Sequence, residues 1–457
     1  MCIGGLELQR KALKADFMTE QSTRIPFHSA SPKVGIILLW YPLFTQPFIF
    51  RDVEAIKTRL PAIVYTLYGE NLRLCSREMC QAGSSAQRLG IKKLLPILFS
   101  NAKFLLGHPL RYTQLFGNHV MRRWKSFEIL GENLWAFLCG IHLAPIVLRA
   151  GIEILYAPWP RGTTTAARVI FHCTGIPYVT VARADNLEPR DPDLVDKLLD
   201  ACAIRTNNCA DGVRIEKLLA EGLSHNTGQS TPEVRVIYNC LTLHVDKCAP
   251  LAMKKPVKLL AVGRFDVTKG FDVLLDACAI LRDQHVSFTL SLVGGGGKLM
   301  GLGNLEERLH RQTRELGLEK IVFFPGLVDH DAFPDILRSH DIFVAPCVIA
   351  SGGARDGIPN TLIEAMSFGL PVVATNVSAL PEIVRHEHTG LLVPQRNPAA
   401  LAQALRTLIE NPEKARILAL NGAKLARELF SPQKNGEILA DFLVQANRAW
   451  RSRKCAE

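Results

Sequence analysis

The sequence lacks the cysteine and histidine patterns that bind metal ions in proteins. Its twelve cysteines are scattered, none forms a CxxC pair, and no His-x3-5-His segment lies near one of them. These absences argue against a zinc site, because structural zinc needs three or four ligands at such spacings. The cysteines instead predict reduced, mostly buried thiols in a cytosolic protein.

The first thirty residues lack a clean apolar signal segment, and no apolar run is long enough to cross a bilayer comfortably. The longest such run, residues 134–148, is broken by His142 and Pro145. Residues 1–30 show no periodicity and predict a loose amino-terminal arm. We therefore expect a cytoplasmic protein, at most peripheral at the inner face of a membrane.

Aromatic residues are few, at 7%, and neither a stacking platform nor a reading helix is apparent, so we expect no nucleic-acid partner. The chain is instead basic, with 54 Lys and Arg against 43 Asp and Glu and a net charge of +11. Residues 86–149 hold nine basic and two acidic residues, or +7, among many Leu, Phe and Trp. This mixture suits an anionic membrane surface. The alternative is a set of amphipathic helices whose cations are solvated.

Continuous apolar runs alternate with segments of helical spacing in both halves of the chain. In the first half the runs at residues 34–40, 62–67, 152–157, 178–182 and 234–237 are typical of buried parallel strands. The second half repeats the pattern at 257–262, 287–293, 321–324, 342–345, 371–374 and 391–393. We predict an α/β protein of two doubly wound, Rossmann-like domains, residues 31–245 and 255–430, facing across a ligand-binding cleft. A helix at 431–450 is expected to return to the first domain.

Three loops follow strands of the second half and carry candidate functional residues. The first, GRFDVTKG at 263–270, offers Arg264 and Lys269 beside the predicted start of a helix, a combination that can hold a diphosphate. The alternative is a surface loop with two solvated cations. The second loop is a run of four glycines at 294–297, which lets the backbone approach a ligand. It matches neither the dinucleotide fingerprint nor a Walker loop, and a flexible turn explains it equally well.

The third loop is the most informative and reads SGGARDGIPNTLIEAM at 351–366. Pro359 is typical of a helix start, and the backbone of residues 357–361 would then face an anion or a sugar oxygen. Asp356 lies in the loop, and Glu364 lies early in the helix, where its carboxylate can accept hydrogen bonds from a diol. The alternative is that Asp356 caps the helix and Glu364 complements the helix dipole.

These motifs carry a family resemblance. Residues 257–429 resemble the retaining glycosyltransferases of family 4, which have the GT-B fold, through GRFDVTKG, DGIPNTLIE, EAMSFGLPVVATNVSALPEIV and HTGLLVP. The form RDGIPN resembles the branch that builds exopolysaccharides such as colanic acid. In the first half, WYPLFTQPFI and GIPYVTVARADN resemble that branch more faintly.

The resemblance implies a metal-independent, retaining hexosyltransferase without a cofactor, whose donor is a nucleotide diphosphate sugar, with a UDP-linked sugar expected. It implies catalytic roles for Arg264 and Lys269 on the diphosphate, for Asp356 on the donor sugar and for Glu364 on the ribose. The implied donor-binding set adds Gly263, Gly295, Gly357, Ile358, Pro359, Asn360 and Thr361. The implied acceptor is a glycan, which could be lipid-linked, bound by the first domain in the biosynthesis of a surface polysaccharide.

Two positions depart from the family pattern, and both lie in the acceptor half. Arg183 stands where members of this branch often carry a histidine, and Gln46 stands where they often carry a glutamate. Arg cannot act as a general base, although it can hold a phosphate or an acceptor oxygen. Two other functions therefore stay open: a catalytically silent partner subunit of a membrane-associated polysaccharide assembly, and a nucleotide-sugar epimerase of the same fold. A phosphorylase would need a pyridoxal-phosphate lysine, for which the sequence offers no signature.

Overall fold

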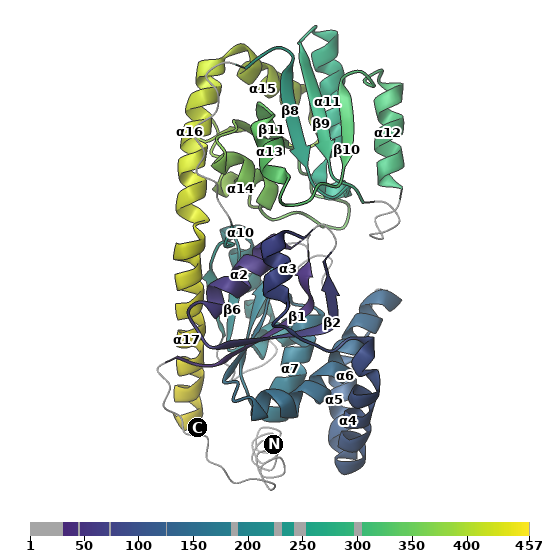
Figure 1. Cartoon of the computed structure of the whole chain (residues 1–457), viewed down its shortest axis with the longest axis vertical. Coiled ribbons are helices and arrows are strands. Elements are labelled where there is room, and N and C mark those ends of the chain that lie inside the picture. Colours follow the sequence, from purple (N-terminus) through teal and green to yellow (C-terminus); the bar gives the residue numbers. More distant parts are fainter. Residues whose placement is uncertain are drawn as a thin grey trace.

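A computed structural model describes residues 31–43, 46–72, 75–124, 126–183, 191–223, 231–241, 253–296 and 304–456. The arm expected at 1–30 lies outside these residues. The rest forms two stacked domains, each built on one sheet (Figure 1). The prediction of an α/β protein with two Rossmann-like domains is therefore confirmed.

The first domain holds a seven-stranded parallel sheet in the order β3-β2-β1-β4-β5-β6-β7. Its strands are β1 (Val34–Leu43), β2 (Ala62–Asn71), β3 (Gln87–Arg88), β4 (Ile154–Ala157), β5 (Tyr178–Ala182), β6 (Ala203–Thr206) and β7 (Glu233–Val236). The second domain holds a six-stranded parallel sheet in the order β10-β9-β8-β11-β12-β13. Its strands are β8 (Val257–Val262), β9 (Phe288–Val293), β10 (Val322–Gly326), β11 (Ile342–Ala345), β12 (Val372–Thr375) and β13 (Leu391–Val393).

Helices cover both faces of each sheet, and the strands are apolar for that reason. Those of the first domain are α2 (Pro47–Lys57), α3 (Arg77–Gly83), η1 (Ile91–Lys93), α4 (Leu94–Gly107), α5 (Pro109–His119), α6 (Phe127–Arg149), α7 (Gly162–Thr174), α9 (Leu194–Leu199) and α10 (Cys209–Leu223). Those of the second are η2 (Val267–Lys269), α11 (Phe271–Asp283), α12 (Leu305–Glu315), α13 (Phe333–Arg338), α14 (Asn360–Ser367), η4 (Leu380–Glu382), α15 (Pro398–Glu410) and α16 (Pro412–Leu429).

The last helix, α17 (Pro432–Ala456), follows α16 and runs along the first domain, where it packs against α2 (Figure 1). Arg59 of the first domain donates to the Gln433 carbonyl at 3.2 Å, and Lys454 donates to the Gly175 carbonyl at 3.2 Å. The helix α17 is thus anchored on the first domain.

The helix α6 corrects one expectation. Its 23 residues run through His142 and Pro145 without ending, so the apolar segment is longer than the sequence predicted. By length and composition it is the one helix within the described ranges that could cross a membrane. Such a helix is weak evidence of a membrane span, because Phe137, Leu143 and Val147 are buried in the core that α6 shares with α7.

The cysteines of the described ranges are all unpaired, and six of the ten are buried. Burial raises the pKa of the Cys173 thiol to about 12. Such thiols remain protonated at neutral pH and are poor nucleophiles.

A buried ion pair holds the first domain together at β6. Arg205 is fully buried and donates to an Asp52 carboxylate oxygen and to the Tyr156 hydroxyl, each at 2.7 Å. It also donates to the carbonyls of Ile237 and Tyr238, each at 3.0 Å. Burial alone would lower the pKa of Arg205, but the Asp52 carboxylate raises it above its usual value, so the guanidinium stays charged. One side chain thus joins α2, β4, β6 and the segment after β7.

We expect Asp52→Ala to lower the free energy of unfolding by about 3–5 kcal/mol, because it leaves the Arg205 charge buried without its partner. Glu78→Ala is the matched control. It breaks the Arg51–Glu78 pair, which has a 2.6 Å contact but lies in solvent, and should cost at most about 1 kcal/mol. Urea unfolding followed by circular dichroism measures both, and equal losses would contradict a structural role for the buried pair.

Candidate donor site

The candidate residues of the second domain meet where its strand order reverses. The neighbouring strands β8 and β11 lead into loops on opposite sides of this switch point, which in open parallel sheets leaves a crevice for ligands. The β8 loop is residues 263–270, and the β11 loop is residues 346–359. Val348 donates its N–H to the Thr268 carbonyl at 2.8 Å, which joins the two loops. A narrow cavity between them is lined in part by Lys269, Cys347, Pro359 and Thr361.

Two glycines allow this close approach. Gly270 has φ +62°, and a Cβ there would lie 2.0 Å from the Pro346 carbonyl oxygen. Gly294 has φ +146°, and a Cβ there would lie 1.9 Å from the Gly263 carbonyl oxygen. Next to it, Gly295 accepts a hydrogen bond from the Phe265 N–H at 3.0 Å. The first glycines of the run therefore pack against the β8 loop. Gly297 lies outside the described residues.

Lys269 and Asp356 form an ion pair across the two loops. Burial alone would lower the pKa of Lys269, but the Asp356 carboxylate raises it. Burial would raise the pKa of Asp356, but Lys269, Arg264 and the Gly357 N–H together lower it. Both groups are thus charged at neutral pH. The sequence assigned these two side chains to different parts of a donor, and the structure pairs them with each other.

Arg264 lies at the mouth of the site and is exposed. Its guanidinium makes no hydrogen bond or ion pair within the described residues, although its charge contributes to the lowered pKa of Asp356. The site therefore has one cation exposed to solvent, Arg264, and a second, Lys269, that is paired with the Asp356 carboxylate.

The helix α14 begins at Asn360, and Pro359 is its N-cap residue. The N-cap makes no side-chain hydrogen bond, so the alternative in which Asp356 caps the helix is wrong. The N–H groups of Ile358, Asn360 and Thr361 have no acceptor among the described residues. Because the first amides of a helix carry partial positive charge, this end of α14 is suited to an anion or a sugar oxygen.

Glu364 lies in the second turn of α14 and is partly buried. Its carboxyl group has no hydrogen-bond or ion-pair partner among the residues described. Burial raises its pKa to about 8. Burial therefore favours the protonated form of Glu364 at pH 7, which the sequence did not predict.

Arg183 follows β5 and is linked to the second domain by hydrogen bonds through the Asn239 side chain. It is buried, donates to the Asn239 side-chain oxygen at 3.0 Å, and lies over the rings of Phe48 and Trp159. Asn239 in turn donates to the Asn360 side-chain oxygen at 3.0 Å. These two hydrogen bonds connect Arg183, which differs from the family pattern, to the start of α14. Gln46, the other residue that differs from the family pattern, is the N-cap of α2 and makes no side-chain capping hydrogen bond.

Glu382 makes a second connection between the domains that the sequence analysis missed. Its carboxylate accepts from the N–H groups of Cys209 and Ala210, at 3.0 and 2.9 Å, at the start of α10. It also accepts from the Tyr238 hydroxyl at 2.9 Å. Glu382 belongs to the quoted motif SALPEIV, so its position was visible, but its partners lie more than 140 residues away.

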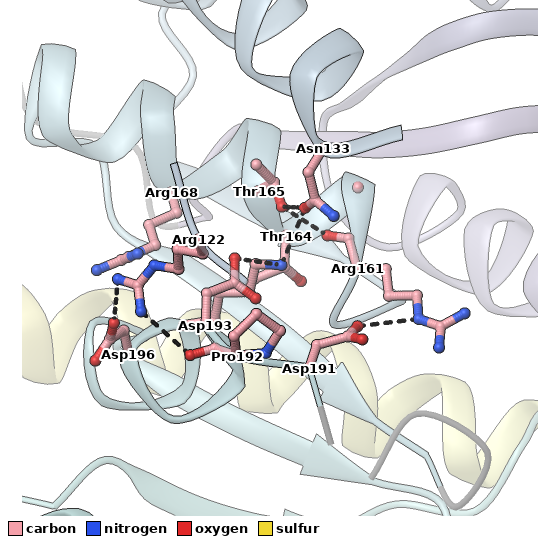
Figure 2. A network of polar contacts seen from close by, with 12 residues as sticks. Arg122, Asn133, Arg161, Thr164, Thr165, Arg168, Asp191, Pro192, Asp193 and Asp196 are labelled. Atoms are coloured by element: carbon pink, nitrogen blue, oxygen red, sulfur yellow. Dashed lines mark hydrogen bonds and ion pairs between the residues drawn. The ribbon is translucent and has the colours of Figure 1, made fainter. Parts of the chain in front are cut away.

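The carboxyl edge of the first sheet is held by polar contacts around α9 (Figure 2). Arg161 donates to the Asp191 carboxylate at 3.1 Å, and Arg122 donates to Asp196 at 2.5 Å and to the Pro192 carbonyl at 3.2 Å. These contacts tie α5, α7 and α9 together. Within the described ranges no group of three or more His, Cys, Asp and Glu side chains is placed to hold a metal ion.

Comparison with known proteins gives a family for the second domain. Residues 247–425 match the family model described as glycosyl transferases group 1. The chain is 30% identical over 213 residues to the putative colanic acid biosynthesis glycosyltransferase WcaL of Escherichia coli K12, which covers 46% of this chain and 50% of that protein. It is 34% identical over 157 residues to the amylovoran biosynthesis glycosyltransferase AmsK of Erwinia amylovora, covering 34% and 37%. The matches thus span half or less of these curated relatives.

Solved structures match nearly the whole chain. Anabaena Alr3699/HepE in complex with UDP has a TM-score of 0.65 at 18% identity and covers 91% of this chain and 100% of its own. Sucrose-phosphate synthase from Thermosynechococcus elongatus has a TM-score of 0.65 at 18% identity and covers 93% and 100%. These likenesses support the GT-B fold. Residues 247–425 are therefore similar to the group 1 glycosyl transferases, and part of the chain is similar to the colanic acid and amylovoran biosynthesis glycosyltransferases.

Proposed function

We propose that this protein transfers a hexosyl group from a nucleotide diphosphate sugar to a glycan acceptor in exopolysaccharide biosynthesis. One observation carries the proposal: Arg264, Lys269 and the open amides of α14 lie at one switch point, in a domain that matches the group 1 glycosyl transferases, and Glu364 lies in the second turn of α14. The solved structure of HepE with UDP-glucose supports a UDP-linked donor.

The diphosphate is placed on the cations and amides. Its charges compete with Asp356 for Lys269, while Arg264 closes the mouth and the N–H groups of α14 point at the departing oxygen. In the reaction, the bond between the anomeric carbon and the β-phosphate oxygen breaks, and its electron pair stays on the diphosphate. An acceptor hydroxyl forms the new bond on the same face, and its proton passes to the diphosphate. Side chains and amides supply the charge stabilisation, so the proposed step needs no metal.

Asp356 and Glu364 have separate roles in the proposal. Once the diphosphate has taken Lys269, the Asp356 carboxylate is available to hydroxyls of the donor sugar. Glu364 accepts hydrogen bonds from the ribose diol, for which the carboxyl group must be ionised. The acceptor, a glycan on a lipid carrier, is placed at the carboxyl edge of the first sheet, at the cytoplasmic face of a membrane.

Arg183 favours a second candidate, a catalytically silent partner subunit. Its guanidinium is buried between two aromatic rings and bonded to Asn239, so it cannot replace the histidine of related proteins as a base. Such a subunit would bind the nucleotide sugar without transferring it. Product analysis with labelled donor separates the two, and an epimerase would be recognised by a changed hexose that is still linked to the nucleotide.

We expect UDP-glucose, at about 100 times its Kd, to stabilise the protein by about 2.7 kcal/mol in a thermal-shift measurement. Lys269→Ala and Glu364→Ala should each weaken binding about 10-fold to 100-fold, since each removes a hydrogen bond that involves a charged group. Lys258→Ala is the control, because that exposed lysine lies at the opposite end of β8. Unchanged affinity in both site variants would place the donor elsewhere.

Asp356→Asn should bind UDP more tightly than the unaltered protein does, by several-fold, because the competing partner of Lys269 has lost its charge. The same variant should lose transfer activity, because Asp356 is proposed to hold the donor sugar. UDP lacks that sugar, so its binding does not depend on this contact. Titration calorimetry with UDP measures the first effect. Weaker UDP binding by Asp356→Asn would contradict the proposed exchange of partners.

We expect UDP binding to release a proton near pH 7, because the bound ribose favours the ionised form of a carboxyl group whose pKa is about 8 when free. The contribution of Glu364 to affinity should therefore rise with pH and level off above about pH 8. Calorimetry in two buffers of different ionisation enthalpy counts the protons released. Glu364→Gln should abolish this contribution, and an undiminished proton release in that variant would refute the assignment.

A further inference from the structure

We propose that the outer face of η1, α4 and the start of α5 docks on the surface of an anionic lipid membrane. This docking face is defined by five apolar side chains that are each at least 72% exposed: Ile91, Leu95, Phe99, Leu106 and Leu110. It lies at the periphery of the first domain, at the lower right of Figure 1.

The folded protein already satisfies the other side of α4. Ile97, Asn101 and Phe104 are buried, and the Asn101 side chain donates to the Leu138 carbonyl of α6 at 3.0 Å. A helix on the surface of a soluble domain normally turns polar residues outward. The helix α4 instead carries apolar side chains on both sides, so packing on α6 leaves a large apolar face uncovered.

The positive charge around the docking face favours an anionic partner. Between Glu78 and Glu128 the sequence has no acidic residue and eight basic ones, at positions 88, 92, 93, 103, 111, 122, 123 and 125. Lys92, Lys93 and Lys103 are exposed on the same segment and form no ion pair within the described residues. Apolar side chains flanked by lysines fit a lipid interface, where the chains enter the acyl boundary and the ammonium groups reach anionic headgroups.

A second copy of this chain fits the face poorly. An isologous interface would place the same basic segments against each other, and like charges oppose such an association. An acidic membrane both covers the apolar face and neutralises its rim.

The position of the docking face suits the proposed lipid-linked acceptor. This point rests on the proposed function, whereas the docking proposal does not depend on it. Phe127, at the start of α6, is 92% exposed. Five residues later, Glu132 accepts the N–H of Gly162 at 2.8 Å, at the start of α7 and beyond the carboxyl end of β4. The helix bundle thus reaches the carboxyl edge of the first sheet, and docking would hold that edge beside lipid headgroups.

Flotation with vesicles made of equal parts phosphatidylglycerol and phosphatidylcholine tests the docking. We expect binding at about 0.05 M salt, clear weakening at about 0.5 M salt, and little binding to phosphatidylcholine alone. Replacing Lys92, Lys93 and Lys103 by Gln should weaken binding about 100-fold, since each cation near such a surface contributes about a factor of five. Absence of binding at low salt would overturn the proposal.

The apolar contribution is tested by Leu95→Gln, Phe99→Gln and Leu106→Gln combined, which should weaken vesicle binding at least about 10-fold. The matched control is Val213→Gln, Phe323→Gln and Ile417→Gln, which alters three exposed apolar side chains elsewhere. Circular dichroism and UDP binding show that the variants are folded and keep the donor site. Equal vesicle binding by the two triple variants would refute lipid as the occupant of this face. So would a dimer of the unaltered protein that is lost in the Leu95, Phe99 and Leu106 variant but kept in the control variant.

Discussion

The reversal of strand order between β8 and β11 is the constraint on which the donor site depends. Parallel strands end at one edge of a sheet, and loops that leave adjacent strands in opposite directions open a crevice there. Gly270 and Gly294 let the backbones close on each other around that crevice. The pairing of Lys269 with Asp356 then follows from proximity, because two opposite charges withdrawn from water stabilise each other only in contact. The same geometry leaves N–H groups of α14 and the carboxyl group of Glu364 without partners among the described residues, which suits a polar ligand.

The domains are joined by directional polar contacts. Glu382 accepts the first amides of α10, Asn239 meets Asn360, and α17 lies along the first domain. Contacts of this kind fix orientation more than they add stability, since each replaces hydrogen bonds to water. The Asn239 contact is especially informative, because it couples Arg183 to the first residue of α14. A change in the acceptor half can therefore reach the donor half through two amide side chains.

Several features were visible in the sequence because they depend on neighbours in the chain. β5 and β13 have the predicted bounds, since short apolar runs between turns are typical of buried strands. β6 was missed because its segment, AIRT, contains Arg205. A charged residue interrupts an apolar run, and it can be buried here only because Asp52, 153 residues away, supplies the opposite charge. The apolar run at 134–148 was interpreted as broken for a related reason: Pro145 usually ends a helix, but α6 continues through it and packs against α7.

By itself the sequence determined the two α/β domains, the loops that follow β8 and β11, and the identity of Arg264, Lys269, Asp356 and Glu364 as candidates. Only the tertiary structure decided how these groups act on one another. It paired Lys269 with Asp356 across 87 positions, left Glu364 protonated by burying it, and turned one apolar side of α4 outward. The physical reason is that charge state and exposure depend on distances through space, whereas a linear pattern records only which residue types the chain contains and in what order.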